Sequence, residues 1–132
     1  MRKLISWLLC VFAIVVLADS RLLPFGWDVE KMADSKHVQF IVINGNPAPT
    51  IRAQQGDTIV VQVRNHLGED LVIVWQAIEK VINRQCNGAD QPIPAGQAVT
   101  YCLAAKQAGE FSYQALSKLQ RDAGLKGSIV VL

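Results

Sequence analysis

Apolar and polar residues alternate in short runs along most of residues 21–132, and turn-forming residues separate the runs. The clearest run is 58–65, where Ile59, Val61 and Val63 fall on one face of an extended chain and the intervening residues on the other. No stretch repeats its apolar residues at the helical period for more than a turn or two. The pattern therefore predicts an all-β chain.

Strands are predicted wherever such a run is bounded by turn residues. The expected strands are 27–32, 37–43, 58–65, 71–76, 97–103, 110–115 and 128–132. The run 71–76 is apolar on both faces, as an inner strand of a packed sandwich would be. A long irregular connection is expected over residues 79–96. Several short strands with regularly spaced turns, and no linker or repeat, favour one β-sandwich or Greek-key barrel domain.

The first 20 residues differ in composition from the rest and read as a secretory signal peptide. Arg2 and Lys3 form a basic start, 4–17 an apolar core, and Ala18-Asp19-Ser20 a small-residue exit. An uncleaved membrane anchor is the alternative, but the apolar run of about 14 residues is shorter than the roughly 20 that span a bilayer. The prediction is therefore a signal peptide over 1–20 and a mature domain over 21–132.

Charge excludes one class of partner. The chain carries 13 Lys and Arg residues against 11 Asp and Glu residues, and no basic cluster stands out along it. A nucleic-acid-binding domain normally shows a basic stripe or patch. Nucleic acid is therefore not an expected partner.

Three cysteines are present, and Cys10 lies in the predicted signal peptide. Cys86 and Cys102 remain in a chain predicted to enter an oxidising compartment, where an even pair usually forms a disulfide. Two free thiols, or a bond to a partner chain, are the alternatives. A Cys86–Cys102 disulfide is the prediction.

Three strings of sequence are more specific than the alternation. Residues 43–53 read Ile-Asn-Gly-Asn-Pro-Ala-Pro-Thr-Ile-Arg-Ala, residues 56–61 read Gly-Asp-Thr-Ile-Val-Val, and residues 120–128 read Gln-Arg-Asp-Ala-Gly-Leu-Lys-Gly-Ser. In this order they resemble the first plastocyanin-like (cupredoxin) domain of the multicopper oxidase family, of the plant L-ascorbate oxidase and laccase type. The resemblance covers about residues 27–132 and implies a single cupredoxin-like Greek-key β-sandwich.

The resemblance also identifies where this family binds copper. Its first domain uses four histidines in two pairs, and the matching positions here hold Val74, Gln76, Gln114 and Leu116, while the tryptophan of the first pair is kept as Trp75. Copper sites favour imidazole and soft sulfur donors, so an alkyl group or a carboxamide is not a usual ligand. The comparison therefore implies that the copper ligands of the trinuclear cluster are lost. We expect no metal ligand, no catalytic residue and no cofactor.

Copper could still bind elsewhere in the chain. A blue-copper site needs two histidines, a cysteine and a weak axial ligand, and no histidine follows Cys102. His37 and His66 fall at a strand start and in a loop, and each is interpreted as a surface residue. No nucleophile elbow, metal-spaced Cys or His cluster, or phosphate-binding glycine loop is present.

The expected function is that of a secreted, non-catalytic, ascorbate oxidase-like domain acting in the extracellular space or apoplast. Its binding surface would include Trp75, Gln76, Gln114 and Leu116, and its partner would be an extracellular protein or a carbohydrate. No membrane contact is expected after signal cleavage. A homo-oligomer is a further expectation, because the resemblance implies a face that other domains normally cover.

Two other functions remain as alternatives at this point. The chain could be a fragment or member of a copper-binding multicopper oxidase. It could also be a small copper carrier that uses His37, His66 or a thiol. Trp75 also has a second interpretation, since a strand tryptophan commonly belongs to the core.

Overall fold

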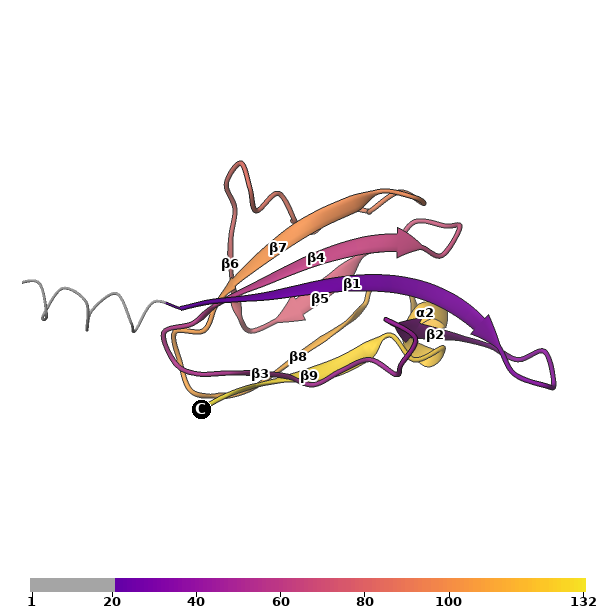
Figure 1. The fold of residues 1–132 in the computed structure, drawn as a ribbon, viewed down its shortest axis with the longest axis horizontal. Helices are drawn as coiled ribbons and strands as arrows, with labels where there is room; N and C mark the ends of the chain where they lie inside the picture. Colours follow the sequence, from indigo (N-terminus) through magenta and orange to yellow (C-terminus); the bar gives the residue numbers. More distant parts are fainter. Residues whose placement is uncertain (1–20) are drawn as a thin grey trace, which may run out of the picture.

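The computed structural model describes residues 21–132, which form two β-sheets packed face to face (Figure 1). The predicted signal peptide, residues 1–20, lies outside the described residues. The sheet orders are β2-β1-β4-β7-β6 and β3-β9-β8-β5. The strands are β1 (Leu22–Ala33), β2 (Gln39–Ile43), β3 (Ile51–Ala53), β4 (Thr58–His66), β5 (Ile73–Gln76), β6 (Glu79–Val81), β7 (Ala98–Ala104), β8 (Gly109–Ala115) and β9 (Lys126–Val131). The predicted all-β sandwich is confirmed.

The core lies between the sheets, and the alternation of each strand decides which side chains enter it. In β4, Ile59, Val61 and Val63 are completely buried, while the residues between them face outward or are only partly covered. Two tryptophans and two tyrosines fill the centre: Trp27, Trp75, Tyr101 and Tyr113, whose neighbouring ring centroids lie 5.0 to 5.7 Å apart. Because aromatic residues bury large areas, this cluster is a main source of stability.

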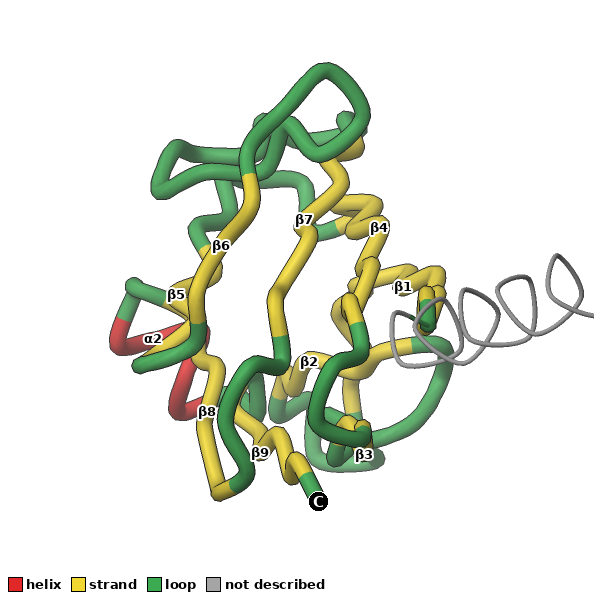
Figure 2. The backbone as a smooth tube through the Cα atoms, turned by 90° about the vertical axis from the view of Figure 1, so that its left-hand side faces the viewer, coloured by secondary structure: helices red, strands yellow, loops and turns green. Residues whose placement is uncertain are grey.

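Some elements differ from the sequence prediction. Strands β3 and β6 were not predicted, and neither was the short helix α2 (Lys118–Asp122), which lies beside β5 and β8 (Figure 2). The run 71–76 was expected to be an inner strand, but β5 is the last strand of its sheet. Its apolar outer residue, Val74, is half-buried at an open face. Apolar residues on both faces of this strand therefore wrongly predicted an inner position in the sheet.

The turn Asn44-Gly45 of the first string has a direct structural explanation. Asn44 and Gly45 both have positive φ, at 53° and 78°, and join Ile43 to Asn46. Tight two-residue connections require this geometry, and Asn-Gly adopts it at low cost. The Asn44 Oδ1 also accepts a 2.8 Å hydrogen bond from the backbone N–H of Asp28. The turn is thereby fixed to strand β1.

Residue 127 of the third string must be glycine because a tyrosine ring lies where a side chain would begin. It pairs with Tyr113 across β8 and β9, and a Cβ at residue 127 would lie 2.4 Å from the Tyr113 Cζ. The tyrosine is completely buried, and its hydroxyl donates a hydrogen bond to the Pro49 carbonyl. Burial also raises the pKa of the Tyr113 hydroxyl well above its usual value, so the group remains a donor. Tyr113 therefore connects the first and third strings.

We expect Gly127→Ala to destabilise the protein by about 1–3 kcal/mol, because overpacking forces buried groups off their preferred rotamers. The measurement is urea unfolding followed by far-UV circular dichroism. Gly26→Ala is the matched control, because its Cβ would meet only the Arg64 Nη2 at an ordinary 3.6 Å. If the two variants unfolded at the same urea concentration, the steric explanation for Gly127 would be wrong.

Candidate functional site

The four positions matched to copper ligands lie along β5 and β8, which pair antiparallel. Val74 is directly opposite Gln114, and Gln76 is opposite Ser112. Because Ile73, Trp75, Tyr113 and Ala115 on the same strands are buried in the core, Val74, Gln76 and Gln114 face outward. Leu116 follows β8 and is 61% exposed. We call Val74, Gln76, Gln114 and Leu116 the ligand-position surface.

Trp75 does not belong to this surface, which corrects the predicted binding set. Its side chain is only 4% exposed and packs against Trp27, Tyr101 and Tyr113. Successive residues of a strand point to opposite faces, so a residue between Val74 and Gln76 must face the core. The core interpretation of this tryptophan is the one that the structure supports.

The third string fixes the end of the ligand-position surface. Arg121 Nη1 donates a 2.7 Å hydrogen bond to the Leu116 carbonyl. The Leu116 N–H in turn donates a 2.9 Å hydrogen bond to the Val72 carbonyl. Gln120 is buried, and its Nε2 donates a 3.0 Å hydrogen bond to the Asp70 carbonyl. The string thus holds the turn after β8 against the loop before β5.

Sequence reasoning missed the polar residues that extend this surface. Ser112 Oγ donates a 2.5 Å hydrogen bond to Gln76 Oε1. Ser128 is the residue of β9 that pairs with Ser112. Gln114 pairs with Lys126 in the same way. Alternation within each strand could have indicated these outward positions, but their neighbours across the sheet depend on strand register.

The predicted disulfide is confirmed. Cys86 and Cys102 are bonded, with their Cα atoms 5.5 Å apart. Cys102 lies in β7, where its register partners are Val60 of β4 and Val81 of β6. The bond therefore ties the long connection 82–97 to β7, an inner strand of the sheet.

The two histidines lie apart from the ligand-position surface. His37 is in the turn between β1 and β2. His66 ends β4, and its Nε2 lies 2.9 Å from Asp28 Oδ1. Hydrogen bonds from Arg64 first, and from His66 second, hold the pKa of the Asp28 carboxyl well below its usual range. This cluster is an ionic network on an exposed sheet face.

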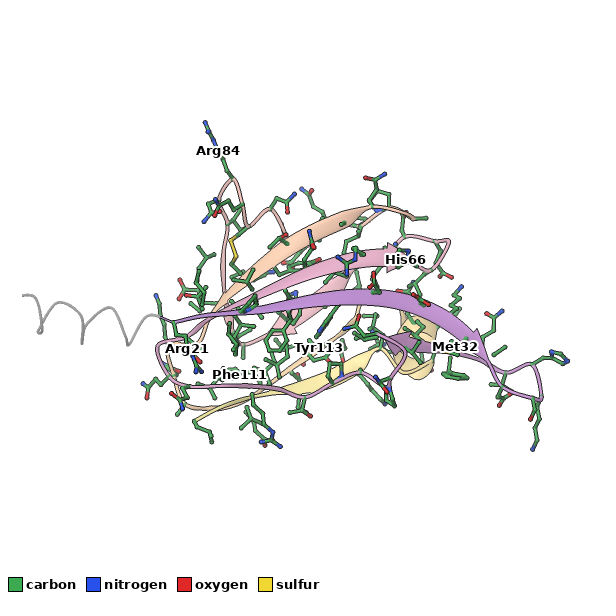
Figure 3. The ribbon with its side chains drawn as sticks, in the orientation of Figure 1. Arg21, Met32, His66, Arg84, Phe111 and Tyr113 are labelled. Atoms are coloured by element: carbon green, nitrogen blue, oxygen red, sulfur yellow. A yellow bond between two sulfur atoms is a disulfide. The ribbon has the colours of Figure 1, made fainter. Side chains whose placement is uncertain are left out.

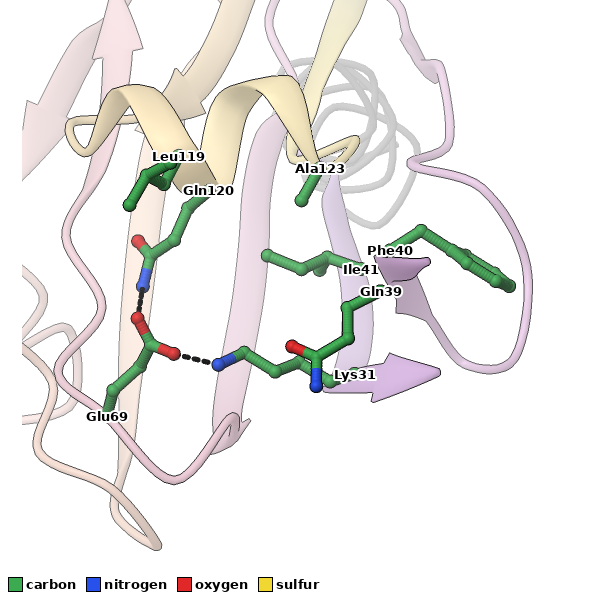
Figure 4. Close-up of a pocket in the computed structure, with 8 residues that line it drawn as sticks. All are labelled: Lys31, Gln39, Phe40, Ile41, Glu69, Leu119, Gln120 and Ala123. Carbon is green, nitrogen blue, oxygen red and sulfur yellow. Dashed lines mark hydrogen bonds and ion pairs between the residues drawn. The ribbon is translucent and has the colours of Figure 1, made fainter. Parts of the chain in front are cut away.

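A separate hollow of about 260 Å³ lies beneath α2 (Figure 4). On its polar side, Lys31 and Glu69 form an ion pair. Gln120 Nε2 donates a 3.2 Å hydrogen bond to the other carboxylate oxygen, Glu69 Oε2. The Lys31 ammonium, and to a lesser degree the Gln120 amide, lower the pKa of the Glu69 carboxyl. These groups already satisfy one another, so the hollow presents no unpaired charge.

None of the four ligand-position side chains has an imidazole or a thiolate, and Gln76 already accepts a hydrogen bond through its one amide oxygen. Within residues 21–132, no group of three or more His, Cys, Asp or Glu side chains lies close enough together to hold a metal ion. The donor set of this surface therefore does not fit copper. In the same part of the chain, no helix is long and apolar enough to cross a membrane.

Solved structures define the class of the fold as a cupredoxin-like domain. A multicopper oxidase from Campylobacter jejuni, described as a metallo-oxidase, matches 84% of the chain with a TM-score of 0.71 and 24% identity, over 26% of its own length. Fet3p, a multicopper oxidase that functions in iron import, matches 84% of the chain with a TM-score of 0.69 and 18% identity, over 23% of its own length. At these identities the likeness shows the fold alone.

Sequence comparison gives the family. The multicopper oxidase family model matches residues 26–132, so the chain belongs to the multicopper oxidase family. L-ascorbate oxidase of Brassica rapa subsp. pekinensis is 33% identical over 95% of the chain and 24% of its own length. L-ascorbate oxidase of Cucumis sativus is 39% identical over 81% of the chain and 20% of its own length. The chain thus spans about a quarter or less of these relatives.

The family match corrects one sequence expectation. We expected no cofactor, but the matched family model and the solved structures are those of multicopper oxidases. Copper is therefore the metal associated with the family to which this chain belongs. The expectation was wrong because it was drawn from the side chains of this chain alone, whereas the family to which the chain belongs is one of multicopper oxidases.

Proposed function

We propose that this multicopper oxidase-family domain is a secreted binding module, and that its ligand-position surface contacts a partner instead of supplying ligands for oxygen reduction. One observation carries the proposal: the four positions hold two alkyl groups and two carboxamides on an open sheet face. Secretion is supported by the signal-like pattern of residues 1–20. By itself the domain is not an oxidase under this proposal.

The same surface explains why a partner is more suitable than a metal. Leu116 is 61% exposed and follows Gln114 by two residues at the end of β8, so water contacts an apolar side chain close to a carboxamide. Interfaces combine apolar contact with hydrogen bonds in this way. A metal site, in contrast, would need several charged or imidazole donors converging on one point.

The proposal is tested by comparing copper content among three proteins. The first is the unchanged protein, the second carries Val74→Ala, Gln76→Ala, Gln114→Ala and Leu116→Ala, and the third carries histidine at the same four positions. After copper loading and dialysis, elemental analysis should give equal copper in the first two and more copper in the third. Histidine pairs on adjacent strands present imidazoles to one face, which favours metal binding.

The alanine variant decides the outcome. Copper held elsewhere in the chain would remain in both the unchanged protein and the alanine variant. If alanine at the four positions removed copper that the unchanged protein carries, the ligand-position surface would be a metal site and the proposal would fail. Circular dichroism of all three proteins controls for folding.

A further inference from the structure

The outer face of the sheet β3-β9-β8-β5 has polar residues in its middle and charged residues toward its ends. Strand register places the residues of β8 and β9 in three rows across this face. Gln114 and Lys126 form the first row, Ser112 and Ser128 the second, and Glu110 and Val130 the third. Tyr113 and Ile129, which alternate with them, are buried in the core, so the three rows face outward. We call these six residues the β8–β9 face.

The β8–β9 face carries a free positive charge in one row and a free negative charge in another. Within residues 21–132, neither Lys126 nor Glu110 forms an ion pair. Their rows are four residues apart along β8, about 13 Å, which is longer than the Debye length of about 8 Å at physiological ionic strength. Asp122, four residues before Lys126, is already bonded to Lys118 at 2.7 Å. Both charges are therefore available to a partner.

The outer face of the other sheet differs, because its charges already pair with one another. Arg64 Nε lies 2.6 Å from Asp28 Oδ1, and His66 Nε2 lies 2.9 Å from the same oxygen. A partner would have to displace these contacts before it could use the charges. The β8–β9 face is therefore the better candidate for an electrostatic contact.

The order of the rows matches a second copy of the same face. Two sheets that pack face to face keep their strands within about 30° of a common line. When the strands of the two copies run antiparallel around a two-fold axis along the second row, the first row of one copy lies over the third row of the other. Gln114 then faces Glu110 of the second copy. Lys126 faces Val130 of the second copy, one strand away from that Glu110. By symmetry, each contact occurs twice.

The residues on the axis must be able to pair with themselves, and those of the second row can. A hydroxyl both donates and accepts, so Ser128 can bond to its own counterpart. Gln76 of β5 continues this row beside Ser112, and a carboxamide also has both a donor and an acceptor. A lysine or glutamate on the axis would instead meet a like charge. Uncharged groups on the axis, with opposite charges on either side of it, are the pattern that a two-fold contact requires.

We propose that the β8–β9 face binds a second copy of this chain across this two-fold axis. Glu110 of each copy accepts hydrogen bonds from Gln114 and Lys126 of the other, and the lysine stem lies over Val130. Arg52 pairs with Val130 from the β3 side, so β9 separates it from Glu110. This inference rests on the proposed function, since Gln114 belongs to the ligand-position surface and the second copy is the partner of that surface.

The test is sedimentation velocity of the secreted protein, produced from the full chain, over a series of concentrations. The unchanged protein should show a monomer–dimer equilibrium. Lys126→Glu and Glu110→Lys should each weaken the dimer by about a hundredfold, because each change turns both symmetric attractions into repulsions. The double variant that carries both changes restores opposite charges at both contacts. Its dimer should be within about tenfold of the unchanged one.

Arg84→Glu is the matched control for reversal of a charge. Arg84 projects from the loop after β6, on the side of the molecule away from β9 (Figure 3), and its variant should dimerise like the unchanged protein. Lys126, Glu110 and Arg84 are all exposed, so the variants should fold. Circular dichroism of each variant checks this.

Three results would overturn the inference. The first is a protein that stays monomeric at every concentration, as it would if the face bound only a different protein or a carbohydrate. The second is a dimer that survives both single charge reversals, because it would use another face. The third is a folded double variant that remains monomeric. Failure of the proposed function shows separately, as copper lost from the alanine variant.

Discussion

Trp75→Ala is expected to lower the free energy of unfolding by about 3–5 kcal/mol, the usual cost of truncating a buried tryptophan. The side chain is 4% exposed and contacts three other aromatic rings at centroid distances of 5.3 to 5.7 Å. Small domains are stable by only about 5–15 kcal/mol. Urea unfolding followed by far-UV circular dichroism should therefore show a large shift to lower urea.

Trp75→Phe is the control for this prediction. The Trp75 Nε1 has no hydrogen-bond partner within the described residues, so phenylalanine removes volume but no hydrogen bond. We expect a smaller loss, about 1–2 kcal/mol, from the partly filled cavity. If the alanine variant were as stable as the unchanged protein, Trp75 would have to lie outside the core, as the first interpretation of this residue assumed.

Replacing both Cys86 and Cys102 by alanine is expected to cost about 3 kcal/mol, because the closed loop restricts the unfolded chain. The two residues are 16 apart in sequence. The loss should appear as a lower urea midpoint, and the reduced unchanged protein should unfold at nearly the same midpoint as the double variant. Both side chains are nearly buried, which is why alanine is preferred to serine.

A second readout separates this loss from a general packing defect. The bond joins the connection 82–97 to β7, so amide hydrogen exchange should accelerate most in that connection and in β6. Strands β8 and β9 of the other sheet should be affected only through global unfolding. A double variant with an unchanged midpoint and unchanged exchange would show that the bond contributes nothing to stability.

The alternation of residues predicted the longer strands well, because burial of one face leaves a clear period of two. It could not predict β3, which has three residues and follows a proline turn, or β6, which pairs at the sheet edge inside an apparently irregular connection. Helix α2 has five residues, too few to show a helical period. The hydroxyl of its N-cap, Ser117, accepts a hydrogen bond from the Gln120 N–H, and a serine at this position is a local signal for a helix start.

The candidate site was predictable in part for the same reason. The strings placed Val74, Gln76, Gln114 and Leu116 on two strands, and alternation placed Val74 with Gln76 on one face. The pairing of Val74 with Gln114 required the register of β5 against β8, which no pattern within one strand contains.

Each sheet contains a pairing between strands that are far apart in the sequence. Strand β3 pairs with the last strand, matching Ile51 to Ile129, and β1 runs parallel to β4. Pairings across such long separations slow folding, because the ends of a long loop must meet before any contact rewards them. During synthesis β3 has no sheet partner until β9 has left the ribosome. We therefore expect the sheet that contains β3 to be completed only after β9 has been synthesised.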